Sequence, residues 1–204
     1  MNREEGIDIM NISLESFRGI RVLVAGDVML DRYVHGEATR ISPEAPVPVL
    51  SVREKTDVPG GAANVAANLS GLGCSVVLFG IAGKDEQAHI LGSMLEGMGV
   101  ENRLVYDGSR LTTTKTRIVS GIQQIVRCDE ESSFPLGVEK EENVFLSLES
   151  RIPEADAVVL SDYGKGLFRG VLPGMSLKRL MQGERRFSSI PRERTGNGTG
   201  ERTA

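Results

Sequence analysis

The chain has 204 residues, of which 40% are hydrophobic and 25% charged, and its formal net charge is −4. This length suits one domain, or one domain plus a tail, with room for a sizeable core. The negative charge and an aromatic content of only 4% argue against a nucleic-acid partner, which needs cations for its phosphates and aromatic faces for its bases. No apolar run is long enough to cross a bilayer, and the acidic N-terminus lacks the apolar stretch of a signal peptide. We therefore expect a cytoplasmic protein without a membrane partner, in which Cys74 and Cys128 are buried free thiols.

Strand and helix patterns alternate along the chain. Residues 1–18 are a polar lead-in, and the apolar run at 21–25 predicts a buried parallel strand. Prolines at positions 43, 46 and 48 exclude a helix and favour an extended loop. The other expected helices are 62–72, 85–98 and 140–150, and the other expected strands are 49–53, 75–81, 103–106, 112–119, 123–128 and 157–160. This alternation is typical of an α/β sandwich with a mostly parallel sheet. The less regular strands within 34–55 and 103–128 indicate an antiparallel appendage or a mixed sheet edge.

The segment Pro59–Gly83, PGGAANVAANLSGLGCSVVLFGIAG, is the most informative part of the chain. Gly60 and Gly61 precede the expected helix and allow a ligand to approach the backbone closely. Their N–H groups lie at a helix N-terminus, which favours oxygen-rich or anionic ligands. Asn64 can both donate to and accept from a sugar hydroxyl. The same segment is also compatible with a glycine-initiated helix that binds nothing.

This segment resembles the first signature of the PfkB carbohydrate kinases, which have the ribokinase-like fold. The matching positions are Gly60, Gly61, Ala62, Asn64, Ala66, Gly73 and Gly83. The resemblance implies a three-layer α/β sandwich with a small β-lid, and ATP and Mg²⁺ as co-substrate and ion. The stretches RISPEAPVPVL, TKTR, QQIVRCDEE and SDYGKG resemble the heptose 7-phosphate kinases in particular. Neither GxGxxG nor a P-loop pattern is present, so a dinucleotide site is unsupported.

Two aspartates follow the first expected strand, in the stretch GDVMLDR. Asp27 and Asp31 thus lie at the carboxyl edge of a parallel sheet, where open α/β sheets bind ligands. The resemblance implies a sugar-binding aspartate near this place. We assign that role to Asp31 by position and keep Asp27 as a second candidate. The alternative is that one of them caps a turn or helix.

Basic side chains on the later strands are candidates for binding phosphate. Lys115, Arg117 and Arg127 alternate with apolar residues, and two of them could converge on the phosphate of a sugar that already carries one. Solvated charges on an edge strand are the alternative interpretation. Asp162 and Lys165, in the stretch DAVVLSDYGKG, would face the cleft between the sugar and nucleotide sites, where Lys165 could screen the transferred phosphate.

The resemblance covers about residues 18–175 and then breaks. Residues 176–204 lose apolar periodicity, are rich in Arg, Gly, Ser and Thr, and are predicted to be a disordered, aberrant tail. The GAGD-type and NxxE-type segments that supply the general base, the anion hole and the Mg²⁺ position in this family do not occur. We therefore expect a fold that is incomplete at its C-terminus, as a frameshift or premature stop would produce, and assign no catalytic residue.

The resemblance implies transfer of the ATP γ-phosphoryl group to O1 of D-glycero-β-D-manno-heptose 7-phosphate, for ADP-heptose and lipopolysaccharide core synthesis. Many such kinases are fused to an adenylyltransferase domain, and members of the family often pair through the lid, which makes a homodimer an expectation here. Three alternatives stay open: an inactive remnant that binds sugar phosphate weakly or does not fold, a PfkB kinase for another sugar or a nucleoside, and a plain α/β binding module. Lys115 and Arg117 favour a phosphorylated sugar, because a neutral one needs no phosphate clamp.

Overall fold

The computed structural model describes residues 13–132 and 134–168 in full and residues 186–190 as backbone. A 3-10 helix at Leu14–Phe17 precedes the first strand, and a second one at Ile152–Glu154 follows the last helix. The remaining elements are β1 Arg21–Gly26, β2 Val28–Ile41, β3 Pro48–Gly61, α1 Ala62–Gly71, β4 Ser75–Gly83, α2 Glu86–Gly97, β5 Glu101–Asp107, β6 Thr114–Ser120, β7 Gln123–Glu130, α3 Val138–Arg151, β8 Ala157–Ser161 and β9 Arg186–Ile190.

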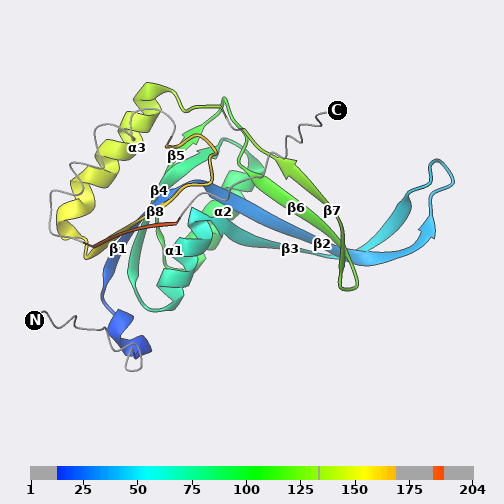
Figure 1. Cartoon of the computed structure of the whole chain (residues 1–204), viewed down its shortest axis with the longest axis horizontal. Coiled ribbons are helices and arrows are strands. Elements are labelled where there is room, and N and C mark those ends of the chain that lie inside the picture. Colours follow the sequence, from blue (N-terminus) through cyan, green and yellow to red (C-terminus); the bar gives the residue numbers. More distant parts are fainter. Residues whose placement is uncertain (1–12, 133, 169–185, 191–204) are drawn as a thin grey trace, which may run out of the picture.

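The main sheet is parallel, with strand order β5-β4-β1-β8-β9. Alternate residues of its central strands face opposite cores, as the two-residue period of a strand requires. Val22 and Val24 of β1 pack with α1 and α2, whereas Leu23 and Ala25 pack with α3. Helices therefore cover both faces, and Figure 1 shows the resulting three layers. Such a sheet needs near-continuous apolar strands, which explains why β4 is buried at every position after its first.

Short side chains and capping residues fix the helices of this sandwich. Ala62, Ala63 and Ala66 are fully buried, so α1 lies close against the sheet. Asp85 caps α2, because its Oδ1 accepts a hydrogen bond from the N–H of Ala88 at 2.9 Å. Burial raises the pKa of Asp85, but hydrogen bonds from Thr112 and Ala88 outweigh that effect and lower it. Within the described part of the chain, no helix is long and apolar enough to span a membrane.

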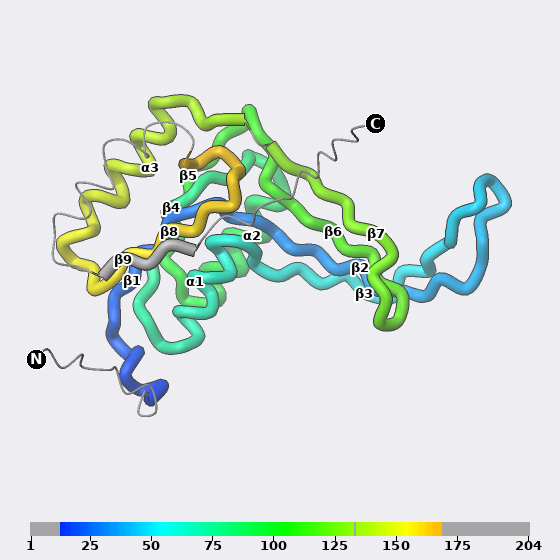
Figure 2. The backbone as a smooth tube through the Cα atoms, in the orientation of Figure 1, coloured from blue at the N-terminus to red at the C-terminus, as the bar shows by residue number. Residues whose placement is uncertain are grey.

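A second, smaller sheet projects from one end of the sandwich (Figures 1 and 2). Its strand order is β3-β2-β6-β7, with β2 antiparallel to β3, parallel to β6, and β6 antiparallel to β7. We call this sheet the lid. The hairpin of β2 and β3 is 14 residues long on each side and pairs from Val28 opposite Gly61 to Ile41 opposite Pro48. Its base is therefore buried beside the main sheet while its far end is exposed.

The structure differs from the sequence predictions at three places. Residues 103–106, expected within the lid range 103–128, belong to β5, which pairs parallel with β4 after the α2 crossover. Cys74 is buried as expected, but Cys128 lies on β7, whose side chains are all exposed. Part of the tail predicted to be disordered, Arg186–Ile190, forms β9 and pairs with the open edge of β8. The rest of residues 176–204 lies outside the described residues.

Removing bulk from the core should separate buried from exposed positions. Leu91 on α2 is fully buried between helix and sheet, whereas Leu146 on α3 is 60% exposed. We expect Leu91→Ala to lower the free energy of unfolding by about 2–5 kcal/mol, because it removes apolar contacts and leaves a cavity. Leu146→Ala should change it by less than about 0.5 kcal/mol. Urea unfolding followed by circular dichroism measures both, and equal losses would contradict this assignment of the core.

Candidate functional site

Asp27 joins the three segments that the sequence singled out. It lies between β1 and β2, at the carboxyl edge of the main sheet, and its side chain is buried. Its backbone N–H donates to the carbonyl of Ser161 at 3.0 Å, and its carbonyl accepts from the N–H of Ala62, also at 3.0 Å. One residue thus connects the end of β8 with the start of α1.

The carboxylate of Asp27 holds the loop that follows β8. It accepts hydrogen bonds from the backbone N–H groups of Tyr163 at 2.8 Å, Lys165 at 3.0 Å and Leu167 at 3.4 Å. Burial raises the pKa of Asp27, and these hydrogen bonds oppose the shift because they favour the charged form. The carboxylate is therefore occupied by backbone donors and holds the loop in position. This contact corresponds to the alternative interpretation of Asp27 as a turn cap.

The two glycines before α1 lie against the aspartates. A Cβ on Gly60 would come 2.5 Å from Oδ2 of Asp31, and a Cβ on Gly61 would come 2.3 Å from the carbonyl oxygen of Asp27. Gly61 also has a φ of +56°, a conformation that favours glycine. Gly61 therefore requires glycine, whereas a side chain at Gly60 would displace the carboxylate of Asp31. The result is a narrow junction of Asp31, the two glycines and the first turn of α1.

The register of the lid aligns the predicted charges on one of its faces. Asp31 pairs with Lys115 and Lys115 with Asp129, forming one row across β2, β6 and β7. Two residues further along, Tyr33 pairs with Arg117 and Arg117 with Arg127. Side chains two apart on a strand share a face, so both rows project on the same side.

Each predicted phosphate-binding cation on this face already has a carboxylate partner. Nη1 of Arg117 lies 2.6 Å from Oδ1 of Asp31, and its guanidinium lies over the ring of Tyr33, 5.2 Å from the centroid. Nζ of Lys115 lies 3.1 Å from Oδ2 of Asp129. Arg127 makes a bidentate pair with Asp129, at 2.8 and 3.0 Å. Partial burial raises the pKa of Asp129, but hydrogen bonds from Arg127 and Lys115 outweigh it and lower the pKa.

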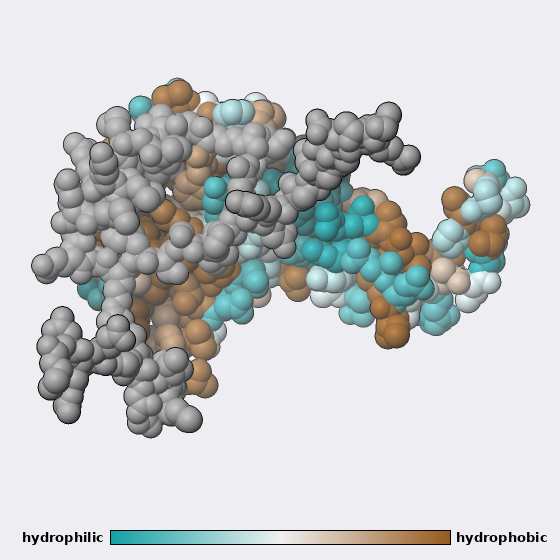
Figure 3. Space-filling model, viewed as in Figure 1, coloured by the Kyte–Doolittle hydropathy of each residue, from teal (hydrophilic) through white to brown (hydrophobic). Residues whose placement is uncertain are grey.

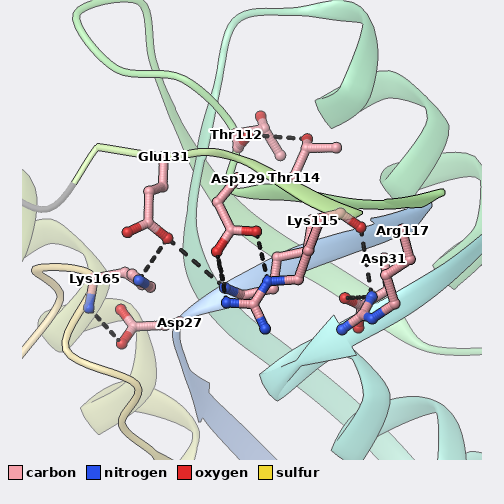
Figure 4. A network of polar contacts seen from close by, with 10 residues as sticks. Asp27, Asp31, Thr112, Thr114, Lys115, Arg117, Asp129, Glu131 and Lys165 are labelled. Carbon is pink, nitrogen blue, oxygen red and sulfur yellow. Dashed lines mark hydrogen bonds and ion pairs between the residues drawn. The ribbon is translucent and has the colours of Figure 1, made fainter. Parts of the chain in front are cut away.

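A second carboxylate connects the lid to the loop after β8. Oε2 of Glu131, the residue that follows β7, lies 2.5 Å from Nζ of Lys165 and 3.8 Å from Nζ of Lys115. Figure 4 shows Glu131 between these two lysines, with Asp129 and Asp27 nearby. The chain of alternating charges therefore runs from the lid to the sandwich. Figure 3 shows a hydrophilic surface over the same part of the lid.

The other two predicted residues lie at the rim of this junction. Asn64 is exposed on the first turn of α1, and its Oδ1 accepts a hydrogen bond from Nδ2 of Asn68 at 3.2 Å. Asp162 follows β8, and its Oδ1 accepts from the N–H of Gly164 at 2.8 Å. Asn64 keeps its amide N–H₂ available to a hydroxyl, whereas Asp162 shapes the turn that carries Lys165.

Sequence reasoning missed three residues of the site: Arg110, Asp129 and Glu131. The side chain of Arg110 is buried beside a small pocket that Asp27 and Lys165 also line. Its Nη2 donates to the carbonyls of Phe134 at 3.0 Å and Lys165 at 3.4 Å, so it fixes the same loop as Asp27 from the other side. Burial lowers the pKa of Arg110. Spacing along the chain gives no signal for Asp129 and Glu131, because their contacts with Lys115 and Lys165 depend on how β6, β7 and the loop after β8 meet in space.

The described residues provide no set of side chains that could bind a divalent ion by themselves. Within residues 13–132 and 134–168, no group of three His, Cys, Asp or Glu side chains is arranged to hold a metal. His35 instead stacks on Tyr33, with ring centroids 6.0 Å apart. The described residues therefore do not fit an Mg²⁺ site built from protein ligands alone.

The chain matches the pfkB family carbohydrate kinase description over residues 20–183. It therefore belongs to the pfkB family of carbohydrate kinases, and the match reaches eight residues beyond position 175, where the motif resemblance was expected to break. Among curated proteins, it is 45% identical to the bifunctional protein HldE of Hahella chejuensis over 173 residues, which is 85% of this chain and 36% of that protein. It is 48% identical to the bifunctional protein HldE of Shewanella sediminis over 158 residues, 77% of this chain and 33% of that one.

Solved structures show the same fold. A carbohydrate kinase from Agrobacterium tumefaciens is 19% identical with a TM-score of 0.64, over 84% of this chain and 53% of that chain. The tetrameric inhibited form of phosphofructokinase-2 from Escherichia coli is 19% identical with a TM-score of 0.59, over 83% and 54%. The predicted ribokinase-like sandwich with a β-lid is thus confirmed. The chain spans about a third of the length of the curated relatives that it matches.

Loss of the Asp27 carboxylate should loosen the loop after β8. Asp27→Ala leaves the N–H groups of Tyr163, Lys165 and Leu167 without their acceptor, and we expect a loss of about 1–3 kcal/mol in the free energy of unfolding. Asp162→Ala removes one hydrogen bond and should cost about 0.5–1 kcal/mol. Hydrogen exchange of residues 163–167 should accelerate much more in Asp27→Ala, and equal rates in the two variants would contradict this role.

Proposed function

We propose that this chain carries the sugar-binding part of a cytoplasmic heptose 7-phosphate kinase. The reaction would transfer the γ-phosphoryl group of ATP to O1 of D-glycero-β-D-manno-heptose 7-phosphate, a step toward ADP-heptose and the lipopolysaccharide core. Support comes from family membership and from four sequence motifs that resemble the heptose 7-phosphate kinases. The chain is also 45–48% identical to proteins called bifunctional, a term that fits kinases fused to a second enzyme.

The observation that carries the proposal is the alignment of sugar-type and phosphate-type contacts on one face. Asp31 abuts Gly60, where a carboxylate suits sugar hydroxyls, and Asn64 lies on the first turn of α1. Lys115 is the register partner of Asp31 on the neighbouring strand, so a cation and the carboxylate proposed to bind sugar hydroxyls lie on the same face of the lid. A sugar that carries a phosphate would need this neighbourhood, because one group must accept hydroxyls while the other binds an anion.

Each side chain has a distinct role in this proposal. Asp31, Gly60, Gly61 and Asn64 would orient the sugar, with Asp27 holding the junction in place. Lys115, Arg117 and Arg127 would bind the phosphate that the substrate already carries, while Asp162 and Lys165 would lie toward ATP. Mg²⁺ would depend on phosphate oxygens, since the described residues offer no cage for it. No general base is assigned among these residues.

Two other functions remain in competition with this one. A kinase for an unphosphorylated sugar or nucleoside would not depend on Lys115 for affinity. A non-catalytic sugar-phosphate-binding protein would bind the heptose phosphate but release no ADP. A coupled ADP-release assay with heptose 7-phosphate, ATP and Mg²⁺ on monodisperse protein separates binding from turnover.

The phosphate clamp gives the sharpest test of substrate class. We expect Lys115→Met to weaken binding of D-glycero-β-D-manno-heptose 7-phosphate at least about tenfold, because it removes a cation that pairs with the phosphate. Binding of the same heptose without its phosphate should change less than about twofold. Titration calorimetry measures both affinities. Lys84→Met, at an exposed lysine, serves as the matched control, and equal losses for both sugars would contradict the clamp.

We further propose that two copies of the chain pair through the lid. Its strands and turns expose apolar side chains that a monomer leaves in water, including Val52 at 52%, Val126 at 47% and Ile122, which is fully exposed at the β6–β7 turn. We expect Ile122→Glu to shift the protein from dimer to monomer, whereas Leu146→Glu, at an exposed site on α3, should not. Light scattering over a range of protein concentrations measures this, and a parent protein that is monomeric throughout would contradict it.

A further inference from the structure

We propose that Glu131 occupies a two-lysine anion site in the free protein and that a phosphate group displaces it there. This inference rests on the proposed function, and it adds a residue that controls access to the phosphate clamp. The starting point is one oxygen atom: Oε2 of Glu131 lies 2.5 Å from Nζ of Lys165 and 3.8 Å from Nζ of Lys115. A single anionic oxygen between two ammonium groups marks the place where a phosphate oxygen would be stabilised.

The two lysines come from opposite sides of the junction. Lys115 lies on β6 of the lid, and Lys165 lies on the loop after β8 of the sandwich (Figure 4). Their side chains are only 17% and 20% exposed, so screening by solvent is reduced at both. Their backbones are held independently of Glu131, Lys165 by the Asp27 carboxylate and Lys115 by the ladder between β2 and β6. The backbones of both lysines are thus fixed whether or not Glu131 occupies the site.

Glu131 is placed so that it can leave. It is the first residue after β7, and its side chain is 31% exposed, so a rotation brings the carboxylate into water without disturbing the core. Lys115 retains Asp129 at 3.1 Å when Glu131 departs, whereas Lys165 has no other carboxylate partner among the described residues. Displacement therefore exposes chiefly the charge of Lys165 and leaves a pair of ammonium groups that a dianionic phosphate satisfies better than one carboxylate.

Two phosphates have the required chemistry: the one already on the sugar and the one that ATP donates. The position of the site, between the lid face with Asp31 and the loop that carries Asp162, is compatible with either. In both cases an oxygen of the phosphate would take the place of Oε2 of Glu131 between the two lysines. Separate titrations with heptose 7-phosphate and with ATP therefore identify which of them gains affinity when Glu131 is neutralised.

The test compares Glu131→Gln with Glu142→Gln, an exposed glutamate on α3 that removes the same charge elsewhere. Inorganic phosphate is the first probe. Its binding is measured by the broadening of its ³¹P line at constant ionic strength, and circular dichroism checks that each variant is folded. We expect Glu131→Gln to bind phosphate about three- to tenfold more tightly than the parent, in line with losing two partly exposed ion pairs as competitors. Glu142→Gln should bind like the parent.

A second variant ties the gain to the lysines. Adding Lys165→Met to Glu131→Gln should abolish the gain in phosphate affinity. Unchanged or weaker phosphate binding in Glu131→Gln would overturn the proposal, as would a gain that survives the loss of Lys165. Because inorganic phosphate is the probe, this test does not depend on the proposed substrate. A protein that does not bind heptose 7-phosphate but shows the Glu131 effect would contradict the proposed substrate and leave the displacement of Glu131 supported.

Discussion

The geometry of the site depends on the buried carboxylate of Asp27. Asp27 ties together two parts of the chain that are distant in sequence. Its backbone bonds to Ser161 at the end of β8 and to Ala62 at the start of α1, and its carboxylate accepts from three backbone N–H groups of the loop after β8. Burying a carboxylate is costly unless it is hydrogen-bonded, which explains why all its contacts are donors. The loop positions Lys165, and the start of α1 positions the two glycines beside Asp31.

The lid turns this fixed edge into a surface with alternating charge. Because residues two apart on a strand share a face, the register of β2, β6 and β7 brings Asp31, Lys115 and Asp129 into one row. A slip of one residue in any of these strands would turn its side chains to the other face of the lid and break the row. The 14-residue hairpin of β2 and β3 prevents such a slip, since it pairs down to the glycines that the aspartates require.

The sequence predicted the elements of the sandwich well because their signals are local. Apolar runs marked β1 and β4, and Gly60 and Gly61 marked the start of α1 to the residue. It also identified both cationic strands, since Lys115 and Arg117 alternate with apolar residues. It could not assign residues 103–106 to a sheet, because a short strand contains no information about its partner. Nor could it foresee that Asp129 and Glu131 neutralise the clamp, because ion pairing depends on register across strands rather than on spacing along one.

Neutralisation has a consequence for which ligands the site accepts. Partly buried cations without partners would destabilise the free protein, so carboxylates satisfy Lys115, Arg117 and Arg127 in advance. A ligand must then offer at least as much negative charge as the carboxylate that it replaces. A neutral sugar offers none and leaves the ion pairs intact, whereas a phosphate dianion supplies more charge and more acceptor oxygens than any one of them. Under the proposed function, the internal pairs would therefore favour phosphorylated sugars over neutral ones before any contact with the sugar ring is made.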